Sequence, residues 1–259
     1  MIKWICFLLL FGFVYGEILE TNDFGLIERE ADRLDSNSLI VFDVDDTLIT
    51  PKDAILHCRR GDVLKGLIPE CPGRNLFREI LVKAPHSIVD ERSRSLMQRL
   101  QEKNIPALAF TAARPRVKRG DPPCDWRIRE LKYHGFDFGS SFPDCEYLEL
   151  LKESNAVQIP MYKQGVLFSA FHPKGLVLVR FLEAIGFFPT KVIFVDDDLK
   201  NVKSVVEELE KVGIACLGVH YTAARDFAAP FDPEWAEFQI NHFLRHDEWL
   251  SDEQIDFKR

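Results

Sequence analysis

Residues 39–48 of the chain, LIVFDVDDTL, hold four apolar residues followed directly by three carboxylates within four positions. The apolar run has the length and composition of a short buried strand. In an open α/β sheet, ligands bind outside the carboxyl ends of the strands, so Asp43, Asp45 and Asp46 are expected in a site rather than in the core. Two carboxylates about 4 Å apart repel by roughly 4 kcal/mol at an effective dielectric constant near 20. The cluster therefore indicates a bound cation or shared protons.

A second acidic cluster follows a second apolar run further along the chain. Residues 191–195, KVIFV, predict another buried strand, and Asp196, Asp197 and Asp198 come directly after it. A helix is expected over 198–212, and Asp198 is well placed to cap its first turn. Capping does not explain Asp196, which follows the apolar residues immediately. The sequence thus places carboxylates at the ends of two strands.

Two more polar residues stand at the ends of expected elements. Thr111 follows a strand expected over 105–110, and Lys174 opens a helix that runs to Ile185. A lysine at the start of a helix is unfavourable against the helix macrodipole. It becomes understandable if the helix start faces an aspartate cluster and a phosphate. Lys163 is a rival for the same role, and the sequence leaves that choice open.

Composition limits the classes of protein that need to be considered. The chain has 259 residues, of which 46% are hydrophobic, which is enough for one substantial core with a small accessory lobe. The formal net charge of -8 argues against a nucleic-acid binder, which usually has a basic face. An EF-hand calcium loop is excluded because Leu48 and Ala54 stand where that loop needs Gly and Glu.

The N-terminus has the layout of a secretory signal peptide. Lys3 supplies a positive charge, residues 4–15 are apolar or Gly, and Gly16 offers a small residue for cleavage. The apolar run is well short of the roughly 20 residues that a membrane-spanning helix needs. We expect residues 1–16 to be removed, the remaining chain to be secreted or periplasmic, and no membrane association after signal removal.

Five cysteines remain after loss of the signal peptide, and an oxidising compartment makes disulfides plausible. Cys216 lies in an apolar, strand-like run and is expected to be a buried free thiol. The other four stand in loop-like settings, and the hypothesis is that Cys58 pairs with Cys71 and Cys124 with Cys145. No spacing is C-x-x-C, so a zinc site is not expected.

The rest of the chain predicts one α/β domain over 17–259, with strands alternating with helices. Residues 50–89 are interrupted by seven Pro or Gly residues and read as a small insertion over the site, too short for a core of its own. Residues 156–169 read as a hairpin, either a second flap or an extension of the main sheet. Helices are expected at 24–34, 90–103 and 125–134, a last strand at 214–219, and two helices in the tail.

The acidic stretch FDVDDTL, with TAARP, HPKG and VDDDLKNV further along, resembles the four motifs of the haloacid dehalogenase (HAD) superfamily. The resemblance covers about residues 20–219. It implies a Rossmann-like, doubly wound parallel sheet (the HAD fold) with small cap insertions. It also implies that Thr111 and Lys174 hold the oxygens of a transferring phosphoryl group.

The same resemblance implies a chemistry for the aspartates. Asp43 would be the nucleophile that forms an aspartyl-phosphate, and Asp45 the general acid and base. Mg²⁺ would bind the Asp43 carboxylate, the Asp45 main-chain carbonyl and Asp196, with Asp197 a neighbouring or alternative ligand. The acid at Asp45 resembles the phosphatases of the superfamily, so the expected activity is hydrolysis of phosphate monoesters.

The chain also resembles a little-characterised group of exported bacterial HAD-like proteins, which brings no known substrate. The expected partner is a small phosphorylated substrate and no nucleic acid. The alternative is a catalytically idle HAD-fold binding or effector module that docks a host protein. The two hypotheses differ in whether the wild-type chain and Asp43→Asn hydrolyse a phosphate ester at different rates.

Overall fold

The computed structural model describes residues 16–57, 66–69, 75–115, 123–151, 159–227 and 232–256. In this part of the chain a central sheet of eight strands has the order β1-β10-β9-β2-β5-β8-β7-β6. The strands are β1 (Glu17–Thr21), β2 (Ser38–Asp43), β5 (Ala107–Thr111), β6 (Tyr147–Glu149), β7 (Met161–Lys163), β8 (Val166–Phe168), β9 (Lys191–Asp196) and β10 (Ala215–Tyr221).

Neighbouring strands from β1 to β8 in the sheet order are parallel, and β7 pairs antiparallel with both β8 and β6, so β7 alone runs in the opposite direction. From β2 the chain moves outward through β5 to β8, then returns to the other side of β2 to form β9 and β10. The direction of winding therefore reverses between β2 and β9. In open α/β sheets this reversal leaves a crevice at the carboxyl ends of the two strands, where ligands bind.

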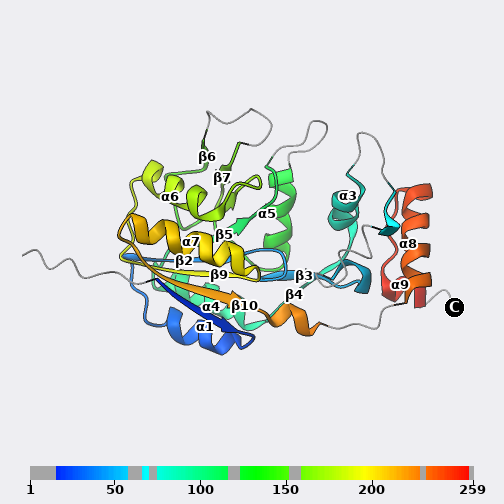
Figure 1. The fold of residues 1–259 in the computed structure, drawn as a ribbon, viewed down its shortest axis with the longest axis horizontal. Coiled ribbons are helices and arrows are strands. Elements are labelled where there is room, and N and C mark those ends of the chain that lie inside the picture. The colour runs from blue at the N-terminus through cyan, green and yellow to red at the C-terminus, as the bar shows by residue number, and fades with distance from the viewer. Residues whose placement is uncertain are drawn as a thin grey trace, which may run out of the picture.

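Helices cover both faces of the sheet (Figure 1). Strand β2 is buried throughout, and its alternate residues serve two cores: Ile40 and Phe42 face one, Leu39 and Val41 the other. The first core contains α1 (Phe24–Ala31), α4 (Arg92–Glu102) and α5 (Pro123–Tyr133), and the second contains α6 (Lys174–Ile185) and α7 (Leu199–Lys211). The expected α/β class with a mostly parallel central sheet is confirmed.

Strand β1 was not expected from the sequence. Residues 17–21, EILET, carry only two apolar side chains, and they lie at the edge of the sheet, paired in parallel with β10. Edge strands are half solvated, so they lack the continuous apolar run that marks a central parallel strand. The sheet thus begins directly after the expected signal peptide, of which residues 1–15 lie outside the described part of the chain.

The expected hairpin at 156–169 is present as β7 and β8, and it extends the main sheet: β8 pairs with β5 and β7 with β8. Its turn, Gln164–Gly165, has positive φ at both residues. A Cβ on Gly165 would lie 2.2 Å from the backbone of Phe138, so this turn requires glycine. A third strand, β6, adds to the hairpin from a region that gave no clear sequence signal.

The insertion after β2 starts with a two-stranded sheet of β3 (Ile49–Pro51) and β4 (His86–Ile88). Between them lie η1 (Ala54–Leu56) and α3 (Leu76–Lys83). These elements share a third hydrophobic core with the C-terminal helix α8 (Pro233–His246), next to which lies α9 (Asp252–Asp256). We call η1, α3, α8 and α9 the second lobe. The sequence did not predict this shared core: the insertion supplies one part of it, and residues about 150 positions further along the chain supply the other.

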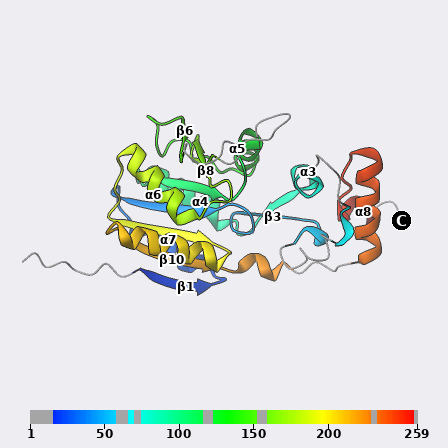
Figure 2. The same ribbon diagram turned by 45° about the horizontal axis from the view of Figure 1, so that its top comes forward.

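The second lobe lies beyond the carboxyl ends of the parallel strands, and β3 and β4 lead from the sheet to it (Figures 1 and 2). The buried carboxylate of Asp53 ties its two parts together. It accepts hydrogen bonds from Trp249 Nε1 at 2.6 Å and from the backbone N–H of Asp252 at 2.9 Å. The two helices expected in the tail are present: Asp232 caps α8, and Ser251 and Gln254 form a capping box at the start of α9.

Two of the cysteine expectations have an outcome. Cys216 is a buried free thiol, as expected, and burial raises its pKa to about 12. The Cys124–Cys145 pairing is wrong, because Cys145 is a free thiol whose side chain packs against the core of α6 and α7. Cys58 and Cys71 lie outside the described residues. None of the described helices is both long enough and apolar enough to span a bilayer.

Candidate active site

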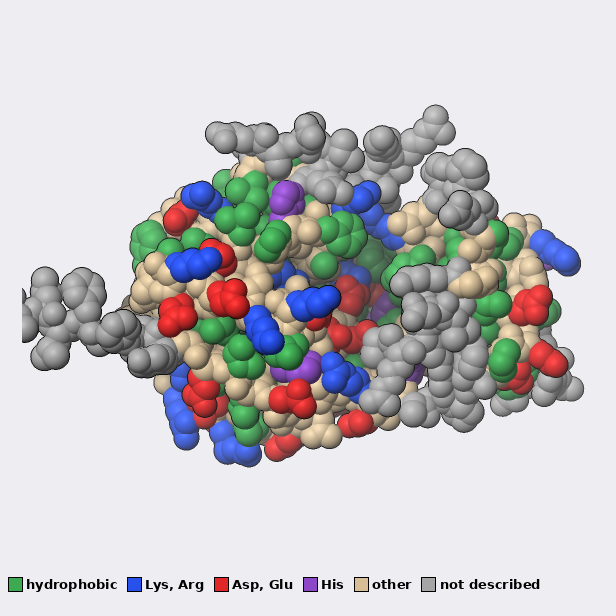
Figure 3. Space-filling view, viewed as in Figure 1, with side chains coloured by type: hydrophobic (Ala, Val, Ile, Leu, Met, Phe, Trp, Pro, Cys, Tyr) green, Lys and Arg blue, Asp and Glu red, His purple; other side chains and the backbone are tan. Residues whose placement is uncertain are grey.

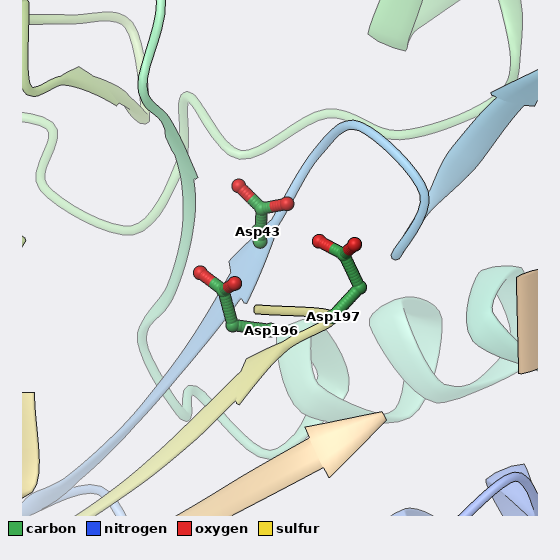
Figure 4. A group of neighbouring side chains, drawn as sticks. All are labelled: Asp43, Asp196 and Asp197. Atoms are coloured by element: carbon green, nitrogen blue, oxygen red, sulfur yellow. The ribbon is translucent and has the colours of Figure 1, made fainter. Parts of the chain in front are cut away.

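Asp43, Asp196 and Asp197 meet where the winding of the sheet reverses. The register of β2 and β9 pairs Phe42 with Val195, so the next residue of each strand, Asp43 or Asp196, emerges at the same level. The carboxylates of the three aspartates offer ligand oxygens within 4.8 Å of one another. Figure 4 shows the three side chains turned toward a common space. The two acidic clusters of the sequence thus form one group.

Lys174 lies inside this group. Its ammonium donates hydrogen bonds to Asp43 Oδ1, to Asp196 Oδ2 at 2.7 Å and to the carbonyl oxygen of Phe110 at 2.9 Å, and its side chain is only 1% exposed. Helix α6 can bring it there because a Cβ on Gly175 would lie 2.0 Å from the Ser204 carbonyl oxygen of α7, an approach that only glycine allows. The rival, Lys163, lies on β7 and pairs with Asp125 at 2.5 Å.

The acidic group is electrostatically unbalanced. Burial, and then the charges of Asp196, Asp197 and Asp45, raise the pKa of Asp43 well above its ordinary value, against the opposing charge of Lys174. The pKa of Asp197 is raised to about 7, first by burial and then by Asp196 and Asp46. Burial lowers the pKa of Lys174, but Asp43 and Asp196 outweigh it and raise that pKa, so the lysine is charged. One cation faces three carboxylates here.

Asp196 and Asp197 are held from behind by a shell of hydrogen bonds. Asp196 Oδ1 accepts from the backbone N–H of Asp198 at 2.9 Å and from Asn201 Nδ2 at 3.1 Å. As expected, the side chain of Asp198 caps α7. The guanidinium of Arg225 donates to the carbonyl oxygen of Asp197 at 3.3 Å. The Asp196 carboxylate and the Asp197 backbone are therefore held in place within the chain.

Asp45 and Thr111 lie beside the acidic group, and their side chains are not members of it. The Asp45 carboxylate is half exposed and pairs with Arg127 at 2.6 Å. The Thr111 hydroxyl is buried and lies 3.4 Å from Asp45 Oδ2, and it accepts a hydrogen bond from the backbone N–H of Ala113. Asp46 turns the other way, in the left-handed region with φ 58°, and accepts from the Thr50 hydroxyl at 2.6 Å.

Sequence reasoning missed Arg127. It lies on α5, only 4% exposed, and bridges Asp45 to Glu130, which in turn contacts His86 of β4 at 2.9 Å. A signal was available: Arg127 adjoins Ile128 on the face of α5 that enters the core, where a solvated arginine has no place. Glu130 also stands three residues after Arg127, which is a usual spacing for an ion pair within a helix.

The acidic group suits a divalent cation. When all three carboxylates are ionised, one ammonium leaves two negative charges uncompensated in a buried place. Figure 3 shows a hollow near the middle of one face of the molecule, where acidic side chains gather with basic side chains around them. Carboxylate and carbonyl oxygens are the ligands that Mg²⁺ prefers. The residues present therefore fit the magnesium ion expected from the sequence.

Comparisons with known proteins find similar chains in two bacterial genera. An "Uncharacterized protein" of Rickettsia prowazekii is 20% identical over 92% of this chain and 90% of its own length. Proteins named "Putative outer membrane protein" in Chlamydia pneumoniae and Chlamydia trachomatis are 22% and 25% identical, over 80% and 79% of this chain and 78% and 77% of their own lengths. The family described as "Protein of unknown function (DUF2608)" matches residues 20–69 and 78–256, and the chain belongs to it.

Proposed function

We propose that this protein is a Mg²⁺-dependent phosphohydrolase of the HAD type that cleaves phosphate monoesters through an aspartyl-phosphate on Asp43. One observation carries the proposal: Asp43 and Asp196, from adjacent strand ends, share one buried place with Asp197 and Lys174. A packed core has no use for three carboxylates around one ammonium. A phosphoryl-transfer site needs a carboxylate nucleophile beside balanced positive charge.

The roles of the residues follow from their positions. Lys174 holds Asp43 Oδ1, and Oδ2, which accepts only a long hydrogen bond of 3.5 Å from the Thr47 hydroxyl, attacks phosphorus. The P–O bond to the leaving group breaks as the Asp43–P bond forms. Asp45 gives its proton to the leaving oxygen and later takes one from the water that hydrolyses the aspartyl-phosphate. Lys174 and Thr111 balance charge on the phosphoryl oxygens, and Arg127 fixes the Asp45 carboxylate in position.

Asp43, Asp196 and the Asp45 main-chain carbonyl, with Asp197 close by, are the groups that would hold Mg²⁺. When bound, the ion neutralises negative charge on the carboxylates and on the phosphoryl group, which otherwise repel each other. Asn201 and the backbone of Asp198 keep Asp196 in place for that role.

We further propose that the protein works outside the cytoplasm, in the periplasm or beyond. The signal-peptide pattern of residues 1–16 supports this location. So do the names of the chlamydial relatives, which refer to the outer membrane. A fusion of residues 1–20 to a reporter that is active only after export would be inactive if the location is wrong.

The test of the activity is hydrolysis of p-nitrophenyl phosphate with Mg²⁺, comparing the wild type with Asp43→Asn. Loss of the nucleophile should lower kcat by roughly 10³-fold or more, on the scale of nucleophile removal in other hydrolases. Asp137→Asn is the matched control, since Asp137 is an exposed acid far along the chain from the site, and it should retain full activity. Equal rates for the wild type and Asp43→Asn would favour a binding module in place of an enzyme.

A further inference from the structure

Three arginines from separate elements come together on the Asp45 side of the site. Arg127 comes from α5, Arg114 from the loop after β5, and Arg78 from α3 of the second lobe. Arg78 Nη2 donates to the carbonyl oxygen of Arg114 at 3.3 Å. The pKa of Arg78 is lowered, first by burial and then by the charges of Arg127 and Arg114. The three guanidinium groups are thus close enough to repel one another.

These arginines outnumber the carboxylates that face them. Arg127 pairs with Asp45 and Glu130, and its buried Nε has no hydrogen-bond acceptor among the described residues. Within the same part of the chain, neither Arg78 nor Arg114 pairs with an acid; the Arg114 guanidinium lies 5.3 Å above the ring of Phe171. Arg127 is buried, Arg78 is partly buried and Arg114 is exposed. Repulsion of a buried or partly buried guanidinium by like charges is unfavourable, and an anion placed between them removes it.

The arginines lie on the side of the site where the leaving group of a substrate would be. Arg127 contacts Asp45, which donates the proton to the leaving oxygen in the proposed mechanism. The phosphoryl group itself belongs with Asp43 and with Lys174, which contacts Asp43. Whatever departs with the leaving oxygen therefore extends past Asp45 toward Arg127, Arg114 and the second lobe.

We propose that Arg78 and Arg114 form a subsite for a second anionic group, a carboxylate or a phosphate, on the leaving-group part of the substrate. This rests on the proposed function for the meaning of the leaving group. Guanidinium groups bind both anions through paired, charge-assisted hydrogen bonds. Because Arg78 belongs to the second lobe and Arg114 to the sheet, the anion would contact both parts of the protein.

A second cationic region is the rival location. Lys200, Lys203 and Arg225 line an opening on the far side of Asp197. The two lysines are exposed on α7, where water solvates their charge, and Arg225 is engaged with the Asp197 carbonyl and with His220. In the arginine cluster, by contrast, Arg127 is buried and Arg78 is partly buried, and Arg78 donates to the Arg114 carbonyl, so the arginine subsite is the stronger candidate.

Binding of three phosphate esters to Asp43→Asn, in the full chain with Mg²⁺, tests the subsite by calorimetry without any need for turnover. The esters are glycerol 3-phosphate, whose leaving group is neutral, 3-phosphoglycerate, which adds a carboxylate, and propane-1,3-diol bisphosphate, which adds a phosphate. We expect one or both anionic esters to bind at least tenfold more tightly than glycerol 3-phosphate. Which of the two gains more identifies the anion.

Adding Arg78→Ala or Arg114→Ala should remove at least tenfold of that preference and leave the binding of glycerol 3-phosphate unchanged. Arg78→Lys should retain part of it, and a thermal unfolding scan shows that each variant is folded. Arg129→Ala is the matched control, because Arg129 is an exposed arginine of the same helix as Arg127. It should bind all three esters like the parent.

Three results would overturn the subsite: equal binding of all three esters, a preference that survives both alanine variants, or a preference lost in Lys203→Ala instead. Wild-type turnover of the same esters separates the two proposals. Tighter binding without hydrolysis of any ester contradicts the phosphohydrolase and leaves the anion subsite standing. Hydrolysis of the esters without a preference between them contradicts the anion subsite and leaves the phosphohydrolase standing.

Discussion

Asp43 and Asp53 are both buried carboxylates, in regions of different character. Asp43 lies at the carboxyl end of β2 with two more acids, and one ammonium, Lys174, faces all three. Asp53 lies in the second lobe, near Asp252 and Glu253, and accepts hydrogen bonds from the neutral donors Trp249 Nε1 and the Asp252 N–H. Burial raises the pKa of both.

The comparison shows that burial of an acid does not by itself mark a functional site. Asp53 has a donor for each carboxylate oxygen, so its environment is complete within the chain and it serves to hold the lobe together. The group around Asp43 has two negative charges more than its lysine can balance. A bound cation or shared protons would complete it, and that remaining charge is what distinguishes a site from a structural contact.

Of the variants that test this difference between the two regions, Lys174→Met is expected to change the free energy of unfolding most. Removal of the buried ammonium leaves three carboxylates facing one another and should lower the free energy of unfolding by about 3–5 kcal/mol. Urea denaturation at pH 7 in EDTA measures this loss. Adding Mg²⁺ should restore part of it, since the ion supplies the missing positive charge. A variant as stable as the wild type in EDTA would contradict the unbalanced site.

Asp53→Ala should have a somewhat smaller effect and one confined to stability. It leaves Trp249 Nε1 and the Asp252 N–H without an acceptor, which should lower the free energy of unfolding by about 2–3 kcal/mol. Hydrolysis of p-nitrophenyl phosphate, measured well below the melting temperature, should be unchanged. Loss of activity with retained stability would mean that Asp53 belongs to the site.

Mg²⁺ should stabilise the two regions unequally. At a concentration 100 times its dissociation constant, the ion should add about 2.7 kcal/mol to the wild type and to Asp53→Asn, visible as a rise of several degrees in Tm. Asp196→Asn should show little of this rise, because it removes one of the ligands. An equal shift in all three proteins would place the ion elsewhere.

The smallest expected effect is a pH dependence from Asp53. Burial raises the pKa of Asp53 in the folded state above its ordinary value of 3.8, so the folded protein holds that proton more tightly than the unfolded chain does. The stabilisation is fully present below 3.8 and is lost as the pH rises through the folded-state pKa. The stability of the wild type relative to Asp53→Asn should therefore increase as the pH is lowered from 7 to 4. A difference that stays constant over this range would mean that the pKa of Asp53 is not raised.

Local sequence patterns predicted most of the elements. The strands after which Asp43, Thr111 and Asp196 stand, and the helices that follow, are present within a few residues of their expected bounds. They were predictable because buried parallel strands read as continuous apolar runs and helices have their own caps and periods. The edge strand β1 and strand β6 lack such runs, so nothing local marked them.

Contacts between distant parts of the chain were not predictable in this way. Three contacts join segments whose local sequences do not predict one another. They are the core that α3 shares with α8, the ion pair of Arg127 with Asp45, and the hydrogen bond from Arg78 to Arg114. The Cys124–Cys145 pairing failed for the same reason. Loop-like surroundings do not show that the Cys145 thiol packs into a core.

The sequence by itself determined that one α/β chain has two strands that end in aspartates, a strand that ends in threonine and a helix that begins with lysine. Each of these features depends only on residues that are neighbours in the chain. Only the tertiary structure decided that Lys174 and not Lys163 joins the acids, since that depends on how closely α6 approaches α7 at Gly175. It alone also brought Arg78 of the second lobe together with Arg114 and Arg127 on the Asp45 side of the site. Charge and burial act through space, so their balance appears only when the chain is folded.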